Sequence, residues 1–224
     1  MIRRDYIMRM IEEFIRALAK IVALKNGRRW GEASVALDEE FKRLIGCGAQ
    51  SVAHLSETEL LARLLQGEPT QAVRQKTLLL TTLLKEAADV AAAEGRTDAS
   101  HDCYLKALHL LLETLAGGEV IEWPEFVPKI DRLVSALDPA PPPRTQVMLM
   151  QHYEHTGEFA KAENALFALL DAEPGNEALA DFGVSFYQRL LEKTDAALSE
   201  GNLPRAEAEE GLKELQRRRR PNLE

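Results

Sequence analysis

Residues 146–176 read QVMLMQHYEHTGEFAKAENALFALLDAEPGN, and this stretch decides the fold. Gly157 is expected to end a first helix, because glycine takes a positive φ without a Cβ clash. After Gly157, small and apolar residues repeat at helical spacing, which predicts a second helix with one apolar stripe. Pro174-Gly175-Asn176 ends that helix, because proline lacks an amide hydrogen and crowds the preceding turn. The stretch therefore predicts two antiparallel helices joined by a short turn.

The spacing within this hairpin resembles the tetratricopeptide repeat. Phe159 follows Gly157 at two residues, Ala162 at five and Pro174 at seventeen. Small Ala162 lets the two helices approach closely. In tetratricopeptide proteins such hairpins stack on one another and build binding surfaces. The resemblance implies a stack of hairpins with a concave groove lined by the first helix of each pair.

Related segments recur along the chain with wider spacing than in a regular array. The four copies begin at Arg28, Gly95, Gly157 and Gly201. The gaps between them are about 67, 62 and 44 residues rather than 34. We expect extra helices over residues 56–65 and 125–137 to fill the first two gaps. The predicted fold is all-α, a tetratricopeptide-like stack of about ten helices in antiparallel α/α hairpins, with insertions.

Local signals support the remaining helices. Ser56 followed by Glu59 is a capping box, which predicts the start of the first inserted helix. Residues 77–84 (TLLLTTLL) are apolar nearly all round, which places the long helix expected over 70–94 in the core. Apolar periodicity also predicts one continuous helix over 177–199.

The N-terminal helix, expected over about residues 3–25, is amphipathic and basic. Residues 1–30 hold eight Lys or Arg and three acidic residues. Such a helix can lie on an anionic membrane or act as a transit peptide. Its ordered apolar side favours a core helix with a solvated charged face instead. This apolar side is predicted to comprise Tyr6, Ile7, Met10, Ile11, Phe14, Leu18, Ile21 and Val22.

Composition limits the classes of function. The net charge of −8 argues against nucleic acid as the main partner, because phosphate binding needs a surplus of cations. No run of about 18 uncharged apolar residues exists, so we expect no membrane span. Cys47 and Cys103 form no CxxC pair, and the N-terminus has no signal-peptide layout. These features predict a cytoplasmic globular protein.

The segment Pro139-Ala140-Pro141-Pro142-Pro143 is the stiffest in the chain. We expect residues 139–143 to be a rigid linker between an N-terminal helical block, 1–138, and a C-terminal tetratricopeptide-like block, 144–224. One continuous domain is the alternative. A docking motif for a proline-reading domain is a second interpretation of the same prolines.

Two polar clusters are candidates for chemistry. His152, His155 and Glu158 share part of a helix face, but their spacing matches neither HExxH nor HxxEH. The second cluster consists of Asp98, His101, Asp102 and Cys103. Because Cys103 falls next to Tyr104 inside an expected helix, we predict a buried structural thiol rather than a nucleophile. Neither cluster predicts a catalytic site.

Three strings resemble a bacterial all-helical family of unknown function. They are Arg4–Glu12 (RDYIMRMIE), Tyr153–Glu163 (YEHTGEFAKAE) and Gly201–Arg205 (GNLPR). The likeness covers nearly the whole chain, and the N-terminal string is its most specific mark. It implies a cytoplasmic tetratricopeptide-like protein and brings no established activity or catalytic residues.

We therefore expect a non-catalytic protein–protein interaction scaffold without metal or cofactor. Its partner is predicted to be a protein or peptide, with a second copy of the chain as one option. Alignment to the hairpin gives the candidate groove residues, which are Lys85, Asp89, Gln151, Glu154 and His155.

Two other functions stay open at this point. The first is a metal- or small-molecule-binding protein, or an enzyme, with a pocket near His152, His155 and Glu158. The second is binding to an anionic membrane or nucleic acid through the N-terminal helix and Arg217–Arg220. Four arginines at a helix end also suit the helix dipole, which favours a structural role.

Overall fold

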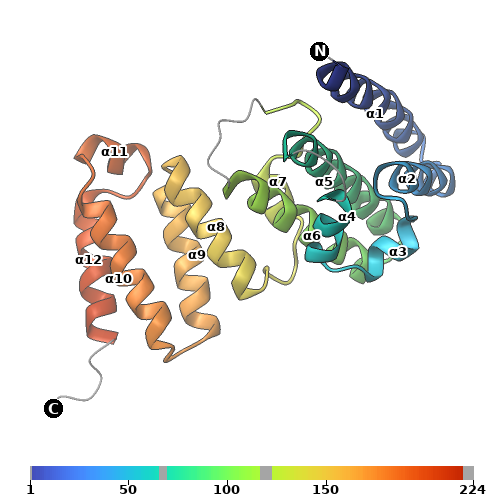
Figure 1. Ribbon diagram of the computed structural model, residues 1–224. Coiled ribbons are helices and arrows are strands. Elements are labelled where there is room, and N and C mark those ends of the chain that lie inside the picture. Colours follow the sequence, from blue (N-terminus) through green and yellow to red (C-terminus); the bar gives the residue numbers. More distant parts are fainter. Residues whose placement is uncertain (1, 66–69, 117–122, 219–224) are drawn as a thin grey trace. The chain divides into compact units, whose positions relative to one another are not determined.

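The computed structural model is helical throughout the residues that it describes (Figure 1). These residues are 2–65, 70–116 and 123–218. They contain twelve helices packed in neighbouring pairs, and no strand. Within them, no helix has the length and apolar character needed to cross a membrane. The all-α class predicted from the sequence is therefore confirmed.

The chain divides into two compact units, residues 1–141 and 142–224. The division falls between Pro141 and Pro142, inside the proline-rich segment where we expect a linker. The last proline of that segment, Pro143, is the first residue of a helix. Proline suits this position because the first amide of a helix has no intrahelical acceptor.

The first unit is organised around a buried central helix. Its helices are α1 (Ile2–Asn26), α2 (Trp30–Ile45), α3 (Ala49–His54), α4 (Glu57–Leu65), α5 (Thr70–Ala93), α6 (Thr97–Ala116) and α7 (Ile130–Ser135). α5 packs against α6, α2, α1 and α4. Every residue from Thr77 to Glu86 is buried. Thr77 and Thr82 donate to the carbonyl oxygens of Val73 and Leu78 at 2.9 and 3.0 Å, so burial leaves these hydroxyls satisfied.

A buried lysine holds the short helix α3, which was not predicted from the sequence. The Lys106 ammonium donates to the carbonyl oxygens of Val52 and Ala53 at 3.2 and 2.7 Å, and it pairs with Asp102 at 2.7 Å. The last carbonyls of a helix lack intrahelical donors and carry the negative end of its dipole. Lys106 therefore joins the C-terminal end of α3 to α6.

The helix predicted over 125–137 is wrong in its first half. α7 begins at Ile130, and residues 125–127 form a turn and bend. Pro128 accounts for the difference, because it lacks an amide hydrogen and disfavours helical φ/ψ in the preceding residue. The turn is closed by Trp123, whose indole N–H donates to the carbonyl oxygen of Val127 at 3.3 Å.

The single helix predicted over 177–199 is also wrong, because the chain forms two helices there. α10 (Glu177–Leu191) ends before Thr194, and α11 (Asp195–Glu200) begins after it. The Thr194 hydroxyl accepts from the amide of Ala197 at 3.2 Å, as a helix N-cap does. With α3, this break explains why twelve helices are described rather than about ten.

The second unit contains the hairpin expected from residues 146–176. α8 (Pro143–Thr156) packs against α9 (Phe159–Ala172), and α10 packs against α12 (Arg205–Arg218). Gly157 has φ 81°, in the left-handed region, and Ala162 is fully buried between helices. The physical roles predicted for these two residues are confirmed.

Gly201 has a different role from Gly157, although both begin a copy of the same pattern. Its φ is −78°, and the left-handed residue is Asn202, with φ 56°. Space is the constraint, because a Cβ on Gly201 would lie 2.3 Å from Cδ2 of Phe159 and 2.5 Å from the carbonyl oxygen of Gly157. The Gly201 carbonyl also accepts from the Ala160 amide at 3.0 Å. Gly201 thus lets the turn before α12 pack directly on the turn before α9.

In α12, the buried small residue does not lie at the position where the repeated pattern predicts it. Ala206, at the position equivalent to Ala162, is exposed, whereas Ala208 is fully buried. A Cβ on Gly211 would lie 2.3 Å from the ring of buried Tyr187 on α10. The close approach of α10 and α12 therefore occurs at Gly211, five residues after the position that the pattern predicted.

The Gly201 contact predicts a loss of stability on adding one methyl group. Gly201→Ala should lower the unfolding free energy by about 1–3 kcal/mol, because the new Cβ overlaps a backbone oxygen that cannot rotate away. Urea denaturation measures this change. Gly31→Ala is the control, since its Cβ meets nothing within 4 Å and it lies within α2. It should be neutral or stabilising by roughly 0.5–1 kcal/mol. Equal stability of Gly201→Ala and the parent would contradict the packing.

Candidate functional site

The most unusual surface of the first unit is an apolar stripe on α1. The stripe consists of Met8, Ile11, Ile15, Leu18 and Val22. These residues follow one another at alternating steps of three and four. Met8, Ile15 and Val22 are 51%, 46% and 37% exposed, and the other two are half-buried. The stripe therefore runs along more than half of the helix and faces outward.

A second apolar stripe on α1 lies beside the first and forms part of the core. Its members are Met10, Phe14, Ile21 and Leu24, all buried. α1 packs against α2 and α5. Together the two stripes form a wide apolar arc on α1. α2 and α5 cover the second stripe and leave much of the first exposed. The expectation that Tyr6 and Val22 belong to the core is therefore wrong, since both are exposed.

Beneath the end of the stripe lies a group of buried charges, here called the ion cluster. It consists of Lys25 from α1, Lys85, Glu86 and Asp89 from α5, and Tyr104 from α6. Lys85 Nζ lies 2.8 Å from Glu86 Oε1 and 2.9 Å from Asp89 Oδ2. Lys25 pairs with both carboxylates, and the Tyr104 hydroxyl donates to Asp89. Two ammonium groups thus balance two carboxylates in the interior.

Electrostatics fix the protonation of two members of the ion cluster. Burial by itself would raise the pKa of Asp89, but hydrogen bonds from Lys25, Tyr104 and Lys85 outweigh it, so the pKa lies below its ordinary value. Burial, followed by the bond to Asp89, raises the pKa of Tyr104 well above its ordinary value. Asp89 is therefore ionised and Tyr104 is a neutral donor at physiological pH.

A hollow of about 670 Å³ opens beside the stripe and above the ion cluster, and we call it the cationic pocket. Leu18 and Val22 of the stripe form one wall. The rest of the lining consists of Lys85, Glu86, Trp123, Glu125, Phe126, Val127, Pro128, Lys129 and Arg132. The Arg132 side chain is 64% exposed, and its Nη2 lies 3.9 Å from Asp89 Oδ2. Apolar walls and a charged base thus meet in one depression.

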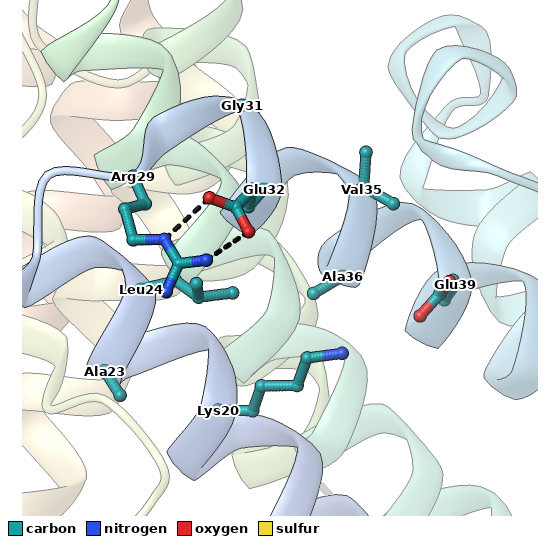
Figure 2. A pocket seen from close by; sticks show the side chains of 9 residues that line it. All are labelled: Lys20, Ala23, Leu24, Arg29, Gly31, Glu32, Val35, Ala36 and Glu39. Atoms are coloured by element: carbon teal, nitrogen blue, oxygen red, sulfur yellow. Dashed lines mark hydrogen bonds and ion pairs between the residues drawn. The ribbon is translucent and has the colours of Figure 1, made fainter.

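A second hollow, of about 610 Å³, lies between α1 and α2 (Figure 2). Figure 2 shows Arg29 and Glu32 pointing toward one another at its edge. Arg29 Nε donates to Glu32 Oε1 at 2.6 Å, and Nη2 donates to the other carboxylate oxygen. Its other lining residues are Lys20, Ala23, Leu24, Gly31, Val35, Ala36 and Glu39. These are mainly small side chains, so this hollow offers less apolar contact than the stripe.

The predicted groove residues fall into different settings. Lys85 and Asp89 belong to the ion cluster of the first unit, where Lys85 also lines the cationic pocket. Glu154 lies in the second unit and accepts from Arg189 Nε and Nη2 at 2.7 and 2.8 Å. Gln151 and His155 are exposed on the same helix, α8. The three charged residues of this set thus have partners within their own unit.

His152 and Glu158, two of the three residues in the predicted metal pocket, contact different neighbours. The His152 ring lies against that of Tyr153, with centroids 5.7 Å apart. Glu158 pairs with Lys161 and accepts from the Thr156 hydroxyl at 3.2 Å. In the described ranges, no three His, Cys, Asp or Glu side chains are arranged to hold a metal ion. The geometry therefore adds nothing in favour of a metal site here.

The environment of Cys103 suits a structural thiol. Burial, and secondarily the charge of Asp102, raises its pKa to about 11. Asp102 itself pairs with Lys106 rather than activating the thiol. Cys103 lines a largely apolar cavity of about 380 Å³ between α2, α3, α5 and α6. A thiol with a raised pKa is a poor nucleophile near neutral pH.

Several residues of this surface were missed by sequence reasoning. Met8 and Ile15 were left out of the apolar side of the N-terminal helix, and Trp123, Lys129 and Arg132 were assigned no role. One signal was available, because apolar residues at 8, 11, 15, 18 and 22 run parallel to a second series at 7, 10, 14, 21 and 24. Two adjacent stripes form a wider arc than a surface helix needs.

Asp89→Asn should destabilise the first unit. The change removes one of two carboxylates that balance Lys25 and Lys85, and breaking a buried ion pair typically costs 3–5 kcal/mol. We expect roughly 2–3 kcal/mol, because the Asp89 side chain keeps 17% of its exposure. Glu39→Gln, at an exposed position in the middle of α2, is the control and should change stability by less than about 0.5 kcal/mol. Thermal unfolding at neutral pH that fails to separate the two variants would contradict this role.

The same carboxylate predicts a pH dependence. The folded-state pKa of Asp89 is lowered, so its stabilisation is complete above the unfolded-state pKa of about 3.9 and is lost as pH falls through the folded-state value. The difference in unfolding free energy between the parent and Asp89→Asn should stay constant from about pH 5 to 8 and narrow below about pH 4. Urea titrations at these pH values measure it. A difference that widens in acid would contradict the lowered pKa.

Comparison with known proteins gives a family and no activity. No curated protein and no solved structure matches the chain. One family model, described as a family of unknown function (DUF6483), matches residues 1–220 and so spans both units. The resemblance to an uncharacterised family noted in the sequence is confirmed to that extent. The chain therefore belongs to this family of unknown function, DUF6483.

Proposed function

We propose that the protein is a non-catalytic interaction scaffold that binds another protein through α1. The exposed stripe of Met8, Ile11, Ile15, Leu18 and Val22 carries this proposal. Isolated exposed apolar residues are ordinary, but a continuous apolar line marks an interaction surface. The stripe lies on a helix that α2 and α5 already hold in place, so the surface is formed before a partner arrives.

Helical hairpins support the scaffold interpretation. We propose that α8–α9 and α10–α12 form a tetratricopeptide-like pair, with α11 as an insertion, in a cytoplasmic protein. Left-handed Gly157, buried Ala162 and the paired helices favour this arrangement. Both cysteines are free, which suits a reducing compartment. Fold likeness alone does not identify the binding face, and the exposed stripe makes α1 the better candidate.

The occupant that fits the stripe is an α-helix. Steps of three and four place Met8, Ile15 and Val22 on one line of α1, with Ile11 and Leu18 on a neighbouring line. This is the a/d pattern by which two helices pack side by side. A partner helix would cover about four turns of α1 and remove the exposed apolar surface from water.

Ile15→Glu tests the proposal, because it puts a charge in the middle of the stripe without touching the core. A protein retained by the immobilised parent chain should be lost from Ile15→Glu, and the same protein, once purified, should bind only the parent. Val35→Glu on α2 is the matched control, since Val35 is 61% exposed and lies outside the stripe. Circular dichroism should show both variants folded. If binding depends on Val35, or if no protein depends on Ile15, α1 is not the docking surface.

A further inference from the structure

We propose that the partner helix is acidic, and that it places a carboxylate side chain in the cationic pocket beside the stripe. This inference rests on the proposed function, because it takes the docking surface on α1 as given. It adds the chemistry of the occupant. The apolar stripe specifies a helix, and the charges around the stripe specify the sign of its flanks.

Cations outnumber carboxylates on the border of the stripe formed by the cationic pocket. On the border away from the pocket, helical geometry places Glu12 next to Met8 and Ile15, with Arg16 one turn after Glu12. Arg16 and Glu12 are largely exposed and only 3.8 Å apart, a weak pair that a stronger partner can replace. The border formed by the cationic pocket adds Lys129, Arg132 and Glu125. Two cations therefore face one carboxylate on the pocket side of the stripe, while Arg16 offsets Glu12 on the other side.

The cationic pocket has the form of a receptor for one side chain. Leu18 and Val22 belong both to its wall and to the stripe, so a helix seated on the stripe lies against the pocket mouth. Arg132 stands at this mouth with a largely exposed guanidinium, and its nearest acidic oxygen, on Asp89, is 3.9 Å away. A partner carboxylate can make the shorter, forked hydrogen bonds that guanidinium groups prefer.

The charges at the base of the pocket favour a carboxylate of the partner over a cation of the partner. Lys85 and Glu86 line the base, and each is already paired within the ion cluster. Asp89 is bonded to Lys25, Lys85 and Tyr104, which occupies its oxygens. An incoming lysine would find Arg132 and Lys129 in the lining, with Glu125 as the one carboxylate there outside the ion cluster. Like charges meeting in a partly desolvated pocket cost free energy, so the charges select against basic helices.

A second copy of this chain is a poorer occupant. In a symmetric pair of α1 helices, each copy would bring α1 itself as the partner helix, and α1 carries Arg16 as well as Glu12 beside its stripe, so it is not an acidic helix. An anionic lipid surface would use the same apolar residues and cations. It would leave the pocket beside them without an occupant.

Two designed peptides separate these possibilities. Both are capped 21-residue helices with Leu and Ile at the a and d positions of the heptad, and they differ only in having Glu or Lys at e and g. Binding is followed by the fluorescence of Trp123, which lines the pocket and is 39% exposed. The full chain has two tryptophans, so Trp30→Phe leaves Trp123 as the single reporter. We expect the Glu peptide to bind at least about tenfold more tightly than the Lys peptide, and the preference to shrink at high salt.

Charge reversal at the pocket then tests the carboxylate contact. Arg132→Glu should weaken the Glu peptide by roughly tenfold or more and strengthen the Lys peptide. Arg63→Glu is the control, because it makes the same change of net charge at an exposed position on α4. Ile15→Glu should abolish binding of both peptides. Equal effects of Arg132→Glu and Arg63→Glu would overturn the pocket contact.

The other outcomes separate this inference from the proposed function. If both peptides bind with equal affinity and Ile15→Glu abolishes this binding, α1 is still the docking surface. The preference for an acidic helix is then overturned. Failure of both peptides overturns the inference, while an Ile15-dependent natural partner would still support the scaffold. A dimer of the chain that disappears with Ile15→Glu assigns the stripe to a second copy. Ile15-dependent binding to phosphatidylcholine vesicles containing phosphatidylserine assigns it to a membrane. Either of these last results overturns the proposal.

Discussion

The contact between Lys25 and the two carboxylates of α5 determines what the rest of the first unit can do. Lys25 lies in the last turn of α1, and Glu86 and Asp89 lie on the most buried helix of the unit. An ammonium taken out of water needs partners close by, and this group provides two. The packing of buried Phe14 and Ile21 and the ion pairs of Lys25 together fix the rotation and register of α1. The outward direction of the stripe follows from that constraint.

Fixing α1 in this way has a cost that bears on function. The helix carries more apolar surface than α2 and α5 can cover, so some of it stays in water. A sequence selected for stability alone would place polar residues at positions 8, 15 and 22. The unit instead keeps a stable interior beside an uncovered apolar line. Because the ion cluster is balanced internally, the cations at the pocket mouth can meet a partner without leaving a buried carboxylate unpaired.

In the second unit, close approach of helices depends on residues that lack side-chain bulk. Ala162, Gly201 and Gly211 each lie where a larger residue would overlap a neighbour or separate two elements. Gly157 is different, because its requirement is a backbone angle rather than space. The same residue type thus serves two physical purposes within one repeated pattern. This difference explains how the segments that begin at Gly157 and Gly201 can share a residue pattern while their packing differs.

Part of the candidate site could be predicted from the sequence. Lys85 and Asp89 were selected by alignment to the hairpin, and both adjoin or line the cationic pocket. Their setting could not be predicted, because Lys25 lies about sixty residues earlier in the chain and no local pattern joins it to α5. Trp123 and Arg132 lie on either side of a turn that was predicted to be helix. Their positions in the pocket beside α1 could therefore not be predicted.

The sequence by itself determined the helical class, most helix ends and the buried run at 77–84. These depend on local chemistry: periodicity of 3.6 residues, glycine and proline at ends, and the Ser56–Glu59 capping box, in which the Ser56 amide donates to Glu59 at 2.8 Å. Only the tertiary structure decided which apolar stripe of α1 is buried and which charges meet. Burial depends on how many neighbours a helix has, and ion pairing depends on distances between segments far apart in the chain. Neither quantity is contained in a local window of residues.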